Sequence, residues 1–227
     1  MFRFSDTKYP IYMKRINILI FSSLMIFAAS CCNKNDETVN TNNTTETVLS
    51  NIANRKSVRS YTGAPISADT IQALLKAAMA APTGMDVRPW RFIVLTDKSQ
   101  YDTIFAGNMN LDKFKQSGAV IILCADTTVT RAPRENPDAP AVTTPNPIWR
   151  DDMGACAENL LLAAEAYGLG AVWTACYPFD DRMDPIKQTM GIPSNVVPYA
   201  VIPIGYPAGD NQPKDKWNPD NIHYGRW

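Results

Sequence analysis

We expect this chain to fold as a single α+β domain with a central sheet, preceded by an N-terminal region of different composition. Helical stripes of apolar residues alternate with short β-branched runs from about Val48 to Trp227, which is the pattern of packed helices and buried strands. The 227 residues are 45% hydrophobic and 19% charged, which is ordinary for a globular protein with a sizeable core. The 22 basic and 22 acidic side chains balance, which argues against a nucleic-acid partner, since such proteins carry a basic surplus.

The N-terminal residues have the pattern of an export signal. Met13-Lys14-Arg15 precede an apolar run over Ile16–Ala29, which is too short for a membrane span of ~20 residues but has the length of a signal-peptide core. The sequence Ala28-Ala29-Ser30-Cys31 resembles a bacterial lipobox, in which the cysteine receives a lipid and becomes the new N-terminus. Residues 1–31 are therefore predicted to be a signal peptide with Cys31 as the lipidated residue, and Met13 is the expected start of synthesis.

This interpretation places the protein in the bacterial cell envelope, at the periplasmic or outer surface, with the membrane contacted only through the lipid anchor. An ordinary secretory signal with two incidental cysteines is the alternative, and Cys32 is a weaker second lipidation site. Residues 33–47 contain five Asn and five Thr, which is too polar for a core, so residues 32–47 are expected to form a disordered polar tether. The folded domain then covers residues 48–227.

The first half of the domain contains one clear helix and two strands. Ser67 can cap a helix that begins at Ala68, and Pro82 ends it. The runs Trp90–Leu95 and Ala119–Cys124 are apolar and β-branched, as in strands buried on both faces. A further helix is predicted around Ser99–Ala106. The apolar stripe of the first helix, spaced i, i+3, i+4, i+7 and i+8, consists of Ile71, Leu74, Leu75, Ala78 and Met79.

The second half contains a long loop, a helix and two strands. Residues 126–149 carry five prolines and no periodicity, which is typical of a functional or disordered loop and suits a substrate lid. A helix is predicted over Asp152–Tyr167, ended by the cap Gly168-Leu169-Gly170. Strands are predicted over Ala171–Tyr177 and Tyr199–Ile204.

Side chains for metal or nucleophile chemistry are sparse. The single histidine, His223, leaves no second imidazole for a zinc site and argues against a histidine-based nucleophile–base pair. Cys124, Cys156 and Cys176 are far apart, odd in number and in apolar contexts, so we expect buried thiols rather than a disulfide framework. No catalytic residue and no metal ligand is therefore assigned, and if the protein is an enzyme a bound cofactor carries the chemistry.

Two segments have the residue types of a ligand site. In Arg55-Lys56-Ser57-Val58-Arg59 the two guanidinium groups share one side of either a helix or an extended backbone, which suits a phosphate dianion. A solvated basic face has the same composition. The segment Ala81–Trp90 places two prolines and a glycine between a helix and a strand, so its amides and carbonyls can clamp a flat heteroaromatic ring or simply close a structural loop.

Five motifs in order resemble the flavin-dependent nitroreductase family over about Val48–Trp227. They are RKSVR, APTGMDVRPWRFIVL, AENLLLAAEAYGLGAVW, IPIGYP and the terminal IHYGRW. The resemblance implies an α+β fold with a central, mainly antiparallel sheet flanked by helices, in a domain-swapped homodimer with FMN at the subunit interface. It also implies NAD(P)H-linked reduction of nitroaromatics, quinones or similar electron-poor small molecules by ping-pong hydride transfer.

The resemblance further implies roles for residues at matching positions. The first motif would hold the FMN phosphate, ribityl chain and pyrimidine edge, the second motif would pack on the ring from the partner subunit, the third would line the ring, and two lysines near the C-terminus would complete the phosphate site. These residues are, in that order, Arg55, Lys56, Ser57 and Arg59; Pro82, Thr83, Met85 and Asp86; Trp173, Thr174 and Ala175; and Lys214 and Lys216. Asn110 and Lys113 fall where some members contact the flavin, in a stretch that matches loosely.

Three positions depart from the family pattern. Asp86 stands where an amide is common, Arg88 where glutamine is common, and Ala175 where glycine often stands. Asp86 can accept a hydrogen bond from the flavin N3–H but cannot donate one, and Arg88 can neutralise it in an ion pair. The alternatives are another flavin chemistry on the same fold, such as dehalogenation, metabolite dehydrogenation or breakdown of the flavin itself, and a non-enzymatic surface lipoprotein that has lost the flavin.

Overall fold

The computed structural model describes residues 41–227. The expected signal peptide, Cys31 and the tether as far as residue 40 lie outside the described residues. Helix α1 (Thr41–Asn54) begins inside the stretch expected to be a disordered tether, so residues 41–47 are helical instead. Packing accounts for the difference, because the amide of Asn51 donates to the carbonyl of Leu162 at 3.0 Å and so ties α1 to a longer helix. In the described part of the chain, no helix has the length and apolar character needed to cross a membrane.

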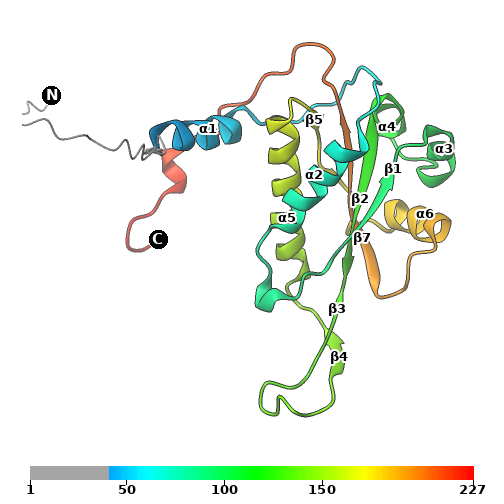
Figure 1. Ribbon diagram of the computed structural model, residues 1–227, viewed down its shortest axis with the longest axis vertical. Coiled ribbons are helices and arrows are strands. Elements are labelled where there is room, and N and C mark those ends of the chain that lie inside the picture. The colour runs from blue at the N-terminus through cyan, green and yellow to red at the C-terminus, as the bar shows by residue number, and fades with distance from the viewer. Residues whose placement is uncertain (1–40) are drawn as a thin grey trace, which may run out of the picture. The chain divides into compact units, whose positions relative to one another are not determined.

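One antiparallel sheet forms the centre of the domain, as expected (Figure 1). Its strand order is β1 (Trp90–Leu95), β2 (Ala119–Asp126), β7 (Val196–Gly205) and β5 (Gly170–Ala171), and β6 (Thr174–Ala175) also pairs with β7. All four strand pairings in this sheet are antiparallel. The predicted α+β class and the mainly antiparallel sheet are therefore confirmed.

The central strand β2 separates two hydrophobic layers. Ile121 and Leu123 are fully buried on the face covered by α2 (Ala68–Met79) and α5 (Trp149–Ala166). Val120 and Ile122 are fully buried on the opposite face, which α3 (Tyr101–Ile104), α4 (Leu111–Gln116) and α6 (Asp180–Met190) cover (Figure 1). Because successive side chains of a strand point to opposite faces, one apolar run supplies both layers.

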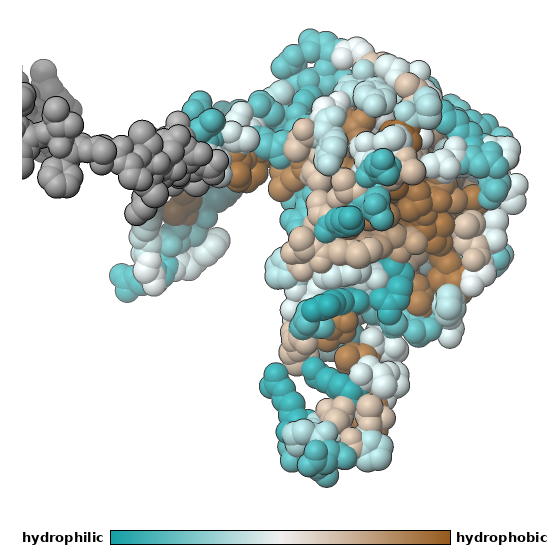
Figure 2. Space-filling model, viewed as in Figure 1, coloured by the Kyte–Doolittle hydropathy of each residue, from teal (hydrophilic) through white to brown (hydrophobic). Residues whose placement is uncertain are grey.

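Two strand predictions need correction. The strand β1 is not buried on both faces, because it is the edge of the sheet in the order given above, and Arg91 and Val94 are exposed. Figure 2 shows apolar surface gathered beside this edge. The strand expected over residues 171–177 is interrupted at Val172 and Trp173, which leaves the short strands β5 and β6 on the same edge of β7.

Helix α2 matches the sequence expectation. It begins at Ala68, and the hydroxyl of Ser67 accepts a hydrogen bond from the amide of Thr70 at 3.1 Å. Ile71, Leu74 and Ala78 from the predicted stripe are buried, but Met79 is 47% exposed.

Helix α5 runs over Trp149–Ala166 and begins three residues before the predicted Asp152. It ends as expected, with Gly168 in a left-handed conformation at φ +68° and the amide of Leu169 donating to the carbonyl of Ala164 at 2.8 Å.

The short helices on the other face are less regular than the sequence suggested. The helix expected over Ser99–Ala106 is a 3₁₀ turn, Lys98–Gln100, followed by the single turn α3. Helices α4 and α6 were not predicted. Helix α6 contains Pro185 and buries only Ile186, so it lacks the apolar stripe by which an amphipathic helix is recognised.

The segment over residues 126–149 is not a loop without regular structure. It contains a two-stranded hairpin of β3 (Thr128–Arg131) and β4 (Val142–Pro145), which projects from the sheet (Figure 1). Asp126 holds its base, because one carboxylate oxygen accepts from both the amide and the hydroxyl of Thr128, at 3.0 and 2.7 Å. The turn residues between the strands hide this pairing from a periodicity search.

The three cysteines are buried, as predicted. Cys124, Cys156 and Cys176 are free thiols with at most 2% of their surface exposed. Burial raises the pKa of each thiol to about 12. They therefore remain protonated at neutral pH and act as small apolar side chains.

Candidate functional site

The segment after α1 is extended and lies against the sheet. Ser57 forms a parallel β-bridge with Ala171, and the amide of Val58 donates to the carbonyl of Ala171 at 3.0 Å. Val58 is completely buried against Gly170, where an added Cβ would lie 2.6 Å from the Val58 side chain. With Val58 inward, its neighbours Ser57 and Arg59 are exposed, so the extended alternative for this motif holds.

A cavity of about 250 Å³ lies over this segment, and its lining residues come from both the beginning and the end of the domain's sequence. Lys214 and Lys216 lie on the C-terminal segment that follows β7 (orange to red in Figure 1). The structure therefore brings together six of the residues predicted for the phosphate site, and adds Gln212, which has no motif of its own. The lining residues are Arg55, Lys56, Ser57, Arg59, Gln212, Lys214 and Lys216.

Two glutamates of α5 hold two of these cations. The Nε of Arg55 lies 3.1 Å from Oε1 of Glu158, and the Nζ of Lys56 lies 2.9 Å from Oε1 of Glu165. Both basic side chains are less than a quarter exposed, so these contacts fix their direction more firmly than a surface ion pair would. Sequence reasoning missed this pair, although a spacing of seven residues on a helix is a detectable signal for one shared face.

The predicted ring-packing loop has a strained backbone. Met85 and Asp86 both have φ of 55° and Arg88 has φ of 53°, which is the left-handed region that non-glycine residues rarely adopt. The loop is tied to the start of α5, because the amide of Gly84 donates to Oδ1 of the buried Asp152 at 2.8 Å.

Asp86 and Arg88 form the ion pair that the sequence allowed. The Nε and Nη2 atoms of Arg88 each donate to one carboxylate oxygen of Asp86, both at 2.6 Å. This bidentate contact holds the pKa of the Asp86 carboxyl below its ordinary value. Both side chains are more than 60% exposed, so the pair stands at the surface of the loop and not in the cationic cavity.

The residues predicted to line a ring are partly buried at the edge of the sheet. Thr174 and Ala175 pair with Val201 and Ala200 of β7, and the indole of Trp173 meets the ring of Tyr199 edge to face at 5.4 Å between centroids. Arg182 of α6 donates from Nη1 to the carbonyl of Ala175 at 2.9 Å. The backbone of β6 is thus fixed from both sides.

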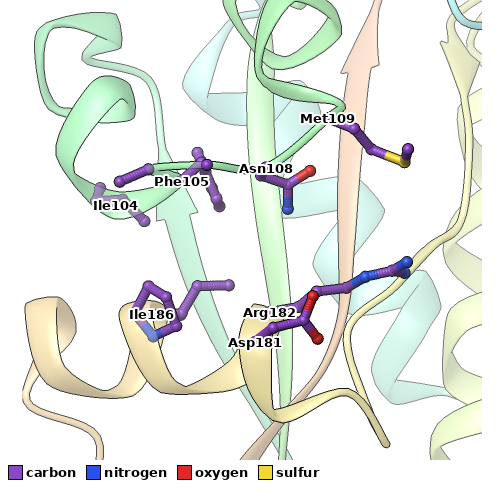
Figure 3. Close-up of a pocket in the computed structure, with 10 residues that line it drawn as sticks. Ile104, Phe105, Asn108, Met109, Asp181, Arg182 and Ile186 are labelled. Carbon is purple, nitrogen blue, oxygen red and sulfur yellow. The ribbon is translucent and has the colours of Figure 1, made fainter.

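Asn110 and Lys113 do not line the cationic cavity. The Nζ of Lys113 donates to Oδ1 of Asn110 at 2.8 Å across the first turn of α4. A separate cavity of about 180 Å³ lies nearby, between the α3–α4 loop with Asn108 and Met109 and the start of α6 with Asp181 and Arg182 (Figure 3). Neither Asn110 nor Lys113 lines it, so their contact with a flavin stays a prediction.

The geometry defines the class of the protein first. An antiparallel sheet between two helical layers carries a cavity lined by five cationic side chains, one serine and one glutamine, and this lining has the charge and the donors that suit a phosphorylated ligand. The sequence matches the profile of the nitroreductase family over residues 52–106 and 100–206. The chain belongs to the nitroreductase family.

Individual relatives agree with this assignment. A candidate NADH dehydrogenase/NAD(P)H nitroreductase of Methanothermobacter thermautotrophicus is 35% identical over 180 residues, which cover 79% of this chain and 87% of the relative. The crystal structure of a protein with the same description from Bacteroides thetaiotaomicron matches with a TM-score of 0.70 and 39% identity, over 80% of this chain and 98% of the other. A candidate nitroreductase from Desulfovibrio desulfuricans, crystallised in complex with FMN, matches with a TM-score of 0.63 and 25% identity over 79% and 96% of the two chains.

Proposed function

We propose that this protein is an FMN-dependent oxidoreductase that uses NAD(P)H to reduce nitroaromatics, quinones or similar electron-poor small molecules. The observation that carries the proposal is the cationic cavity, which assembles the family's first motif and the C-terminal lysines in one place. Family membership and the names of the relatives support the same chemistry, since those names include NAD(P)H nitroreductase and one relative was crystallised with FMN.

The cavity fits the phosphate group of FMN. Of its five cations, Arg55 and Lys56 are paired with glutamates, whereas Arg59, Lys214 and Lys216 form no ion pair within residues 41–227. A positive surplus therefore remains for a phosphate dianion, and Ser57 can donate a hydroxyl to it. Guanidinium groups bind phosphate oxygens in pairs, so Arg55 and Arg59 would give the contact its direction.

The chain itself binds and orients the reactants. FMN, when bound, supplies the two-electron redox chemistry, so no side chain need act as nucleophile or general base. Trp173, Thr174 and Ala175 would form one wall beside the flavin ring, held rigid by β7 and by Arg182. Pro82, Thr83, Met85 and Asp86 would pack on the ring of the partner subunit. Such fixed surfaces favour reaction by holding nicotinamide or acceptor against the ring.

We further propose that the protein is a homodimer with the flavin at its interface. Trp217, Tyr224 and Trp227 of the C-terminal segment are 73%, 90% and 98% exposed, and an accumulation of large exposed apolar side chains favours a protein–protein interface. On α1, Val48, Leu49 and Ile52 are also at least half exposed. A mass in solution of twice the chain would support the dimer, whereas a flavin-loaded monomer would contradict it.

Colour and reduction test the function. The purified protein should be yellow, should release FMN on denaturation, and should be reduced by NADH or NADPH in a stopped-flow experiment before nitroaromatic or quinone is consumed. Reduction of FMN without turnover of those acceptors would favour another flavin chemistry on the same fold. A colourless protein that ignores added FMN would leave the non-enzymatic surface lipoprotein as the better account.

The lipid anchor is a separate proposal that rests on the sequence alone. The motif Ala28-Ala29-Ser30-Cys31 supports lipidation at Cys31 and a location in the cell envelope. Replacing this thiol in Cys31→Ala should abolish incorporation of labelled palmitate and release the protein from the membrane fraction. Cys32→Ala is the matched control and should be labelled normally, and unchanged labelling of Cys31→Ala would remove that residue from the account.

A further inference from the structure

We propose that Asp152 is a positioning residue that holds the loop over residues 83–88 in the shape needed to place Asp86 against the flavin. The proposal deepens the function above and rests on it, because the loop's contact with FMN comes from that function. What is new is the route by which α5, a helix packed on the sheet, would control the loop.

The contact between Asp152 and Gly84 is buried and direct. Asp152 is 5% exposed in the first turn of α5, and its Oδ1 accepts from the Gly84 amide at 2.8 Å. The approach is close, since an added Cβ at Gly84 would lie 1.8 Å from Cδ1 of Ile148 and would force that side chain to move. The backbone of the loop therefore contacts the start of α5 directly, and the Asp152 carboxylate accepts the hydrogen bond at that contact.

The loop needs an external tie because its own conformation is unfavourable. Non-glycine residues in the left-handed region are unfavourable and persist only when their surroundings over-determine them, and Met85, Asp86 and Arg88 all adopt it. The Asp86–Arg88 ion pair is exposed and lies within the loop, so it cannot fix the loop to the rest of the domain.

Other contacts from the loop to the domain are weaker. The guanidinium of Arg131 in the hairpin donates to the Sδ atom of Met85 at 2.9 Å, but a thioether is a poor acceptor and both side chains are exposed. A carboxylate bound to a backbone amide inside the protein is a stronger contact. Asp152 is thus the firmest hydrogen-bonded tie between the loop and the sheet-packed helices in residues 41–227.

The second oxygen of Asp152 indicates that the carboxylate serves the loop and not the stability of the core. Its Oδ2 is buried and finds no hydrogen-bond partner within the described residues. Burying a carboxylate for a single bond disfavours folding, and an apolar side chain of similar volume would fill the space better. The carboxylate therefore serves to fix the position of Gly84, and the position of Gly84 in turn sets the direction in which Asp86 points.

The test is the FMN affinity of apoprotein in a double-mutant cycle. Asp152→Ala should weaken FMN binding at least tenfold and change the visible circular dichroism of bound flavin, because Asp86 no longer faces it. Asp86→Ala should do the same, and the double variant should be no weaker than either single variant. Asp151→Asn, on the exposed neighbour in the same helical turn, controls for the charge at the helix start and should bind as the wild type does.

Each outcome decides a different point. Additive losses in the double variant, or an Asp152→Ala protein that binds FMN like the wild type, overturn the positioning role and leave the proposed function intact. Wild-type protein that binds no FMN overturns both. If Asp152→Ala does not fold, Asp152→Asn keeps Oδ1 in place and should retain wild-type affinity, whereas Asp152→Glu keeps the charge but displaces the oxygen and should lose it. If Asp152→Glu instead retained wild-type affinity for FMN and Asp152→Asn lost it, the charge of the side chain and not the position of its oxygen would control FMN binding.

Discussion

The cationic cavity and the loop over residues 83–88 differ in where the partners of their charged side chains come from. In the cavity, Arg55 and Lys56 are paired with Glu158 and Glu165 of a different element, and the paired basic side chains are mostly buried. In the loop, Arg88 pairs with Asp86 two residues away, and both are largely exposed. The cavity is therefore organised by the tertiary fold, whereas the charges of the loop neutralise each other locally.

This difference sets what each region can contribute. A cavity in which two of the five cations are held in advance by another element has fewer long side chains to order when an anion binds, so its contacts should dominate the affinity for FMN. A neutral, exposed ion pair has a weak field and should modulate redox properties only slightly. Three predictions, from the largest effect to the smallest, test this contrast.

Removing the cavity's guanidinium groups should have the largest effect. Arg55→Gln/Arg59→Gln deletes two charge-assisted contacts, each of about 1.5–3 kcal/mol, so FMN affinity should fall at least a hundredfold. Fluorescence titration of apoprotein with FMN measures it. Lys115→Gln is the control. It breaks the ion pair in which Nζ of Lys115 lies 2.6 Å from Oδ1 of Asp102, and neither residue lines the cavity. Near-wild-type binding by the double variant would show that the arginines do not meet the phosphate.

Disturbing the support beneath the cavity should have an intermediate effect. Gly170→Ala would force a Cβ to 2.6 Å from Val58, which should destabilise the fold by roughly 1–3 kcal/mol and weaken FMN binding about tenfold as the Ser57 segment shifts. Chemical denaturation and FMN titration measure the two effects. Gly154→Ala in α5 meets nothing closer than 3.9 Å and should instead stabilise the protein by up to about 1 kcal/mol. Equal behaviour of the two variants would contradict the role of Gly170.

Unmasking the loop charge should have the smallest effect. Arg88→Gln leaves the Asp86 carboxylate unpaired, and its negative charge disfavours the electron density of reduced flavin. The midpoint potential should therefore fall, by less than the ~30 mV that corresponds to a tenfold change in a two-electron equilibrium. Asp86→Asn/Arg88→Gln should return the potential to the wild-type value in a redox titration. A potential that Arg88→Gln leaves unmoved would mean that Asp86 does not face the flavin.

Elements set by local sequence patterns could be predicted from the sequence, whereas elements set by tertiary contacts could not. Helix α2, its Ser67 cap and the strand β2 followed from local patterns, because capping and apolar runs need only neighbouring residues. Helix α6 and the β3–β4 hairpin did not follow, since Pro185 interrupts the helical pattern and the polar hairpin has no buried face in its alternation. Helix α1 extends into a polar tract because its contact with α5 compensates for the low helix propensity of that tract.

The sequence by itself determined the fold class and the main core strands, and it predicted a phosphate motif at residues 55–59, since each depends on residue types and short spacings. Only the tertiary structure decided that Gln212 reaches the segment of Arg55, that Glu158 and Glu165 hold two of the cations, and that Asp152 meets Gly84. The physical reason is separation along the chain: these groups meet only because α5 and the sheet bring distant backbone together, and no local pattern encodes the distance between them.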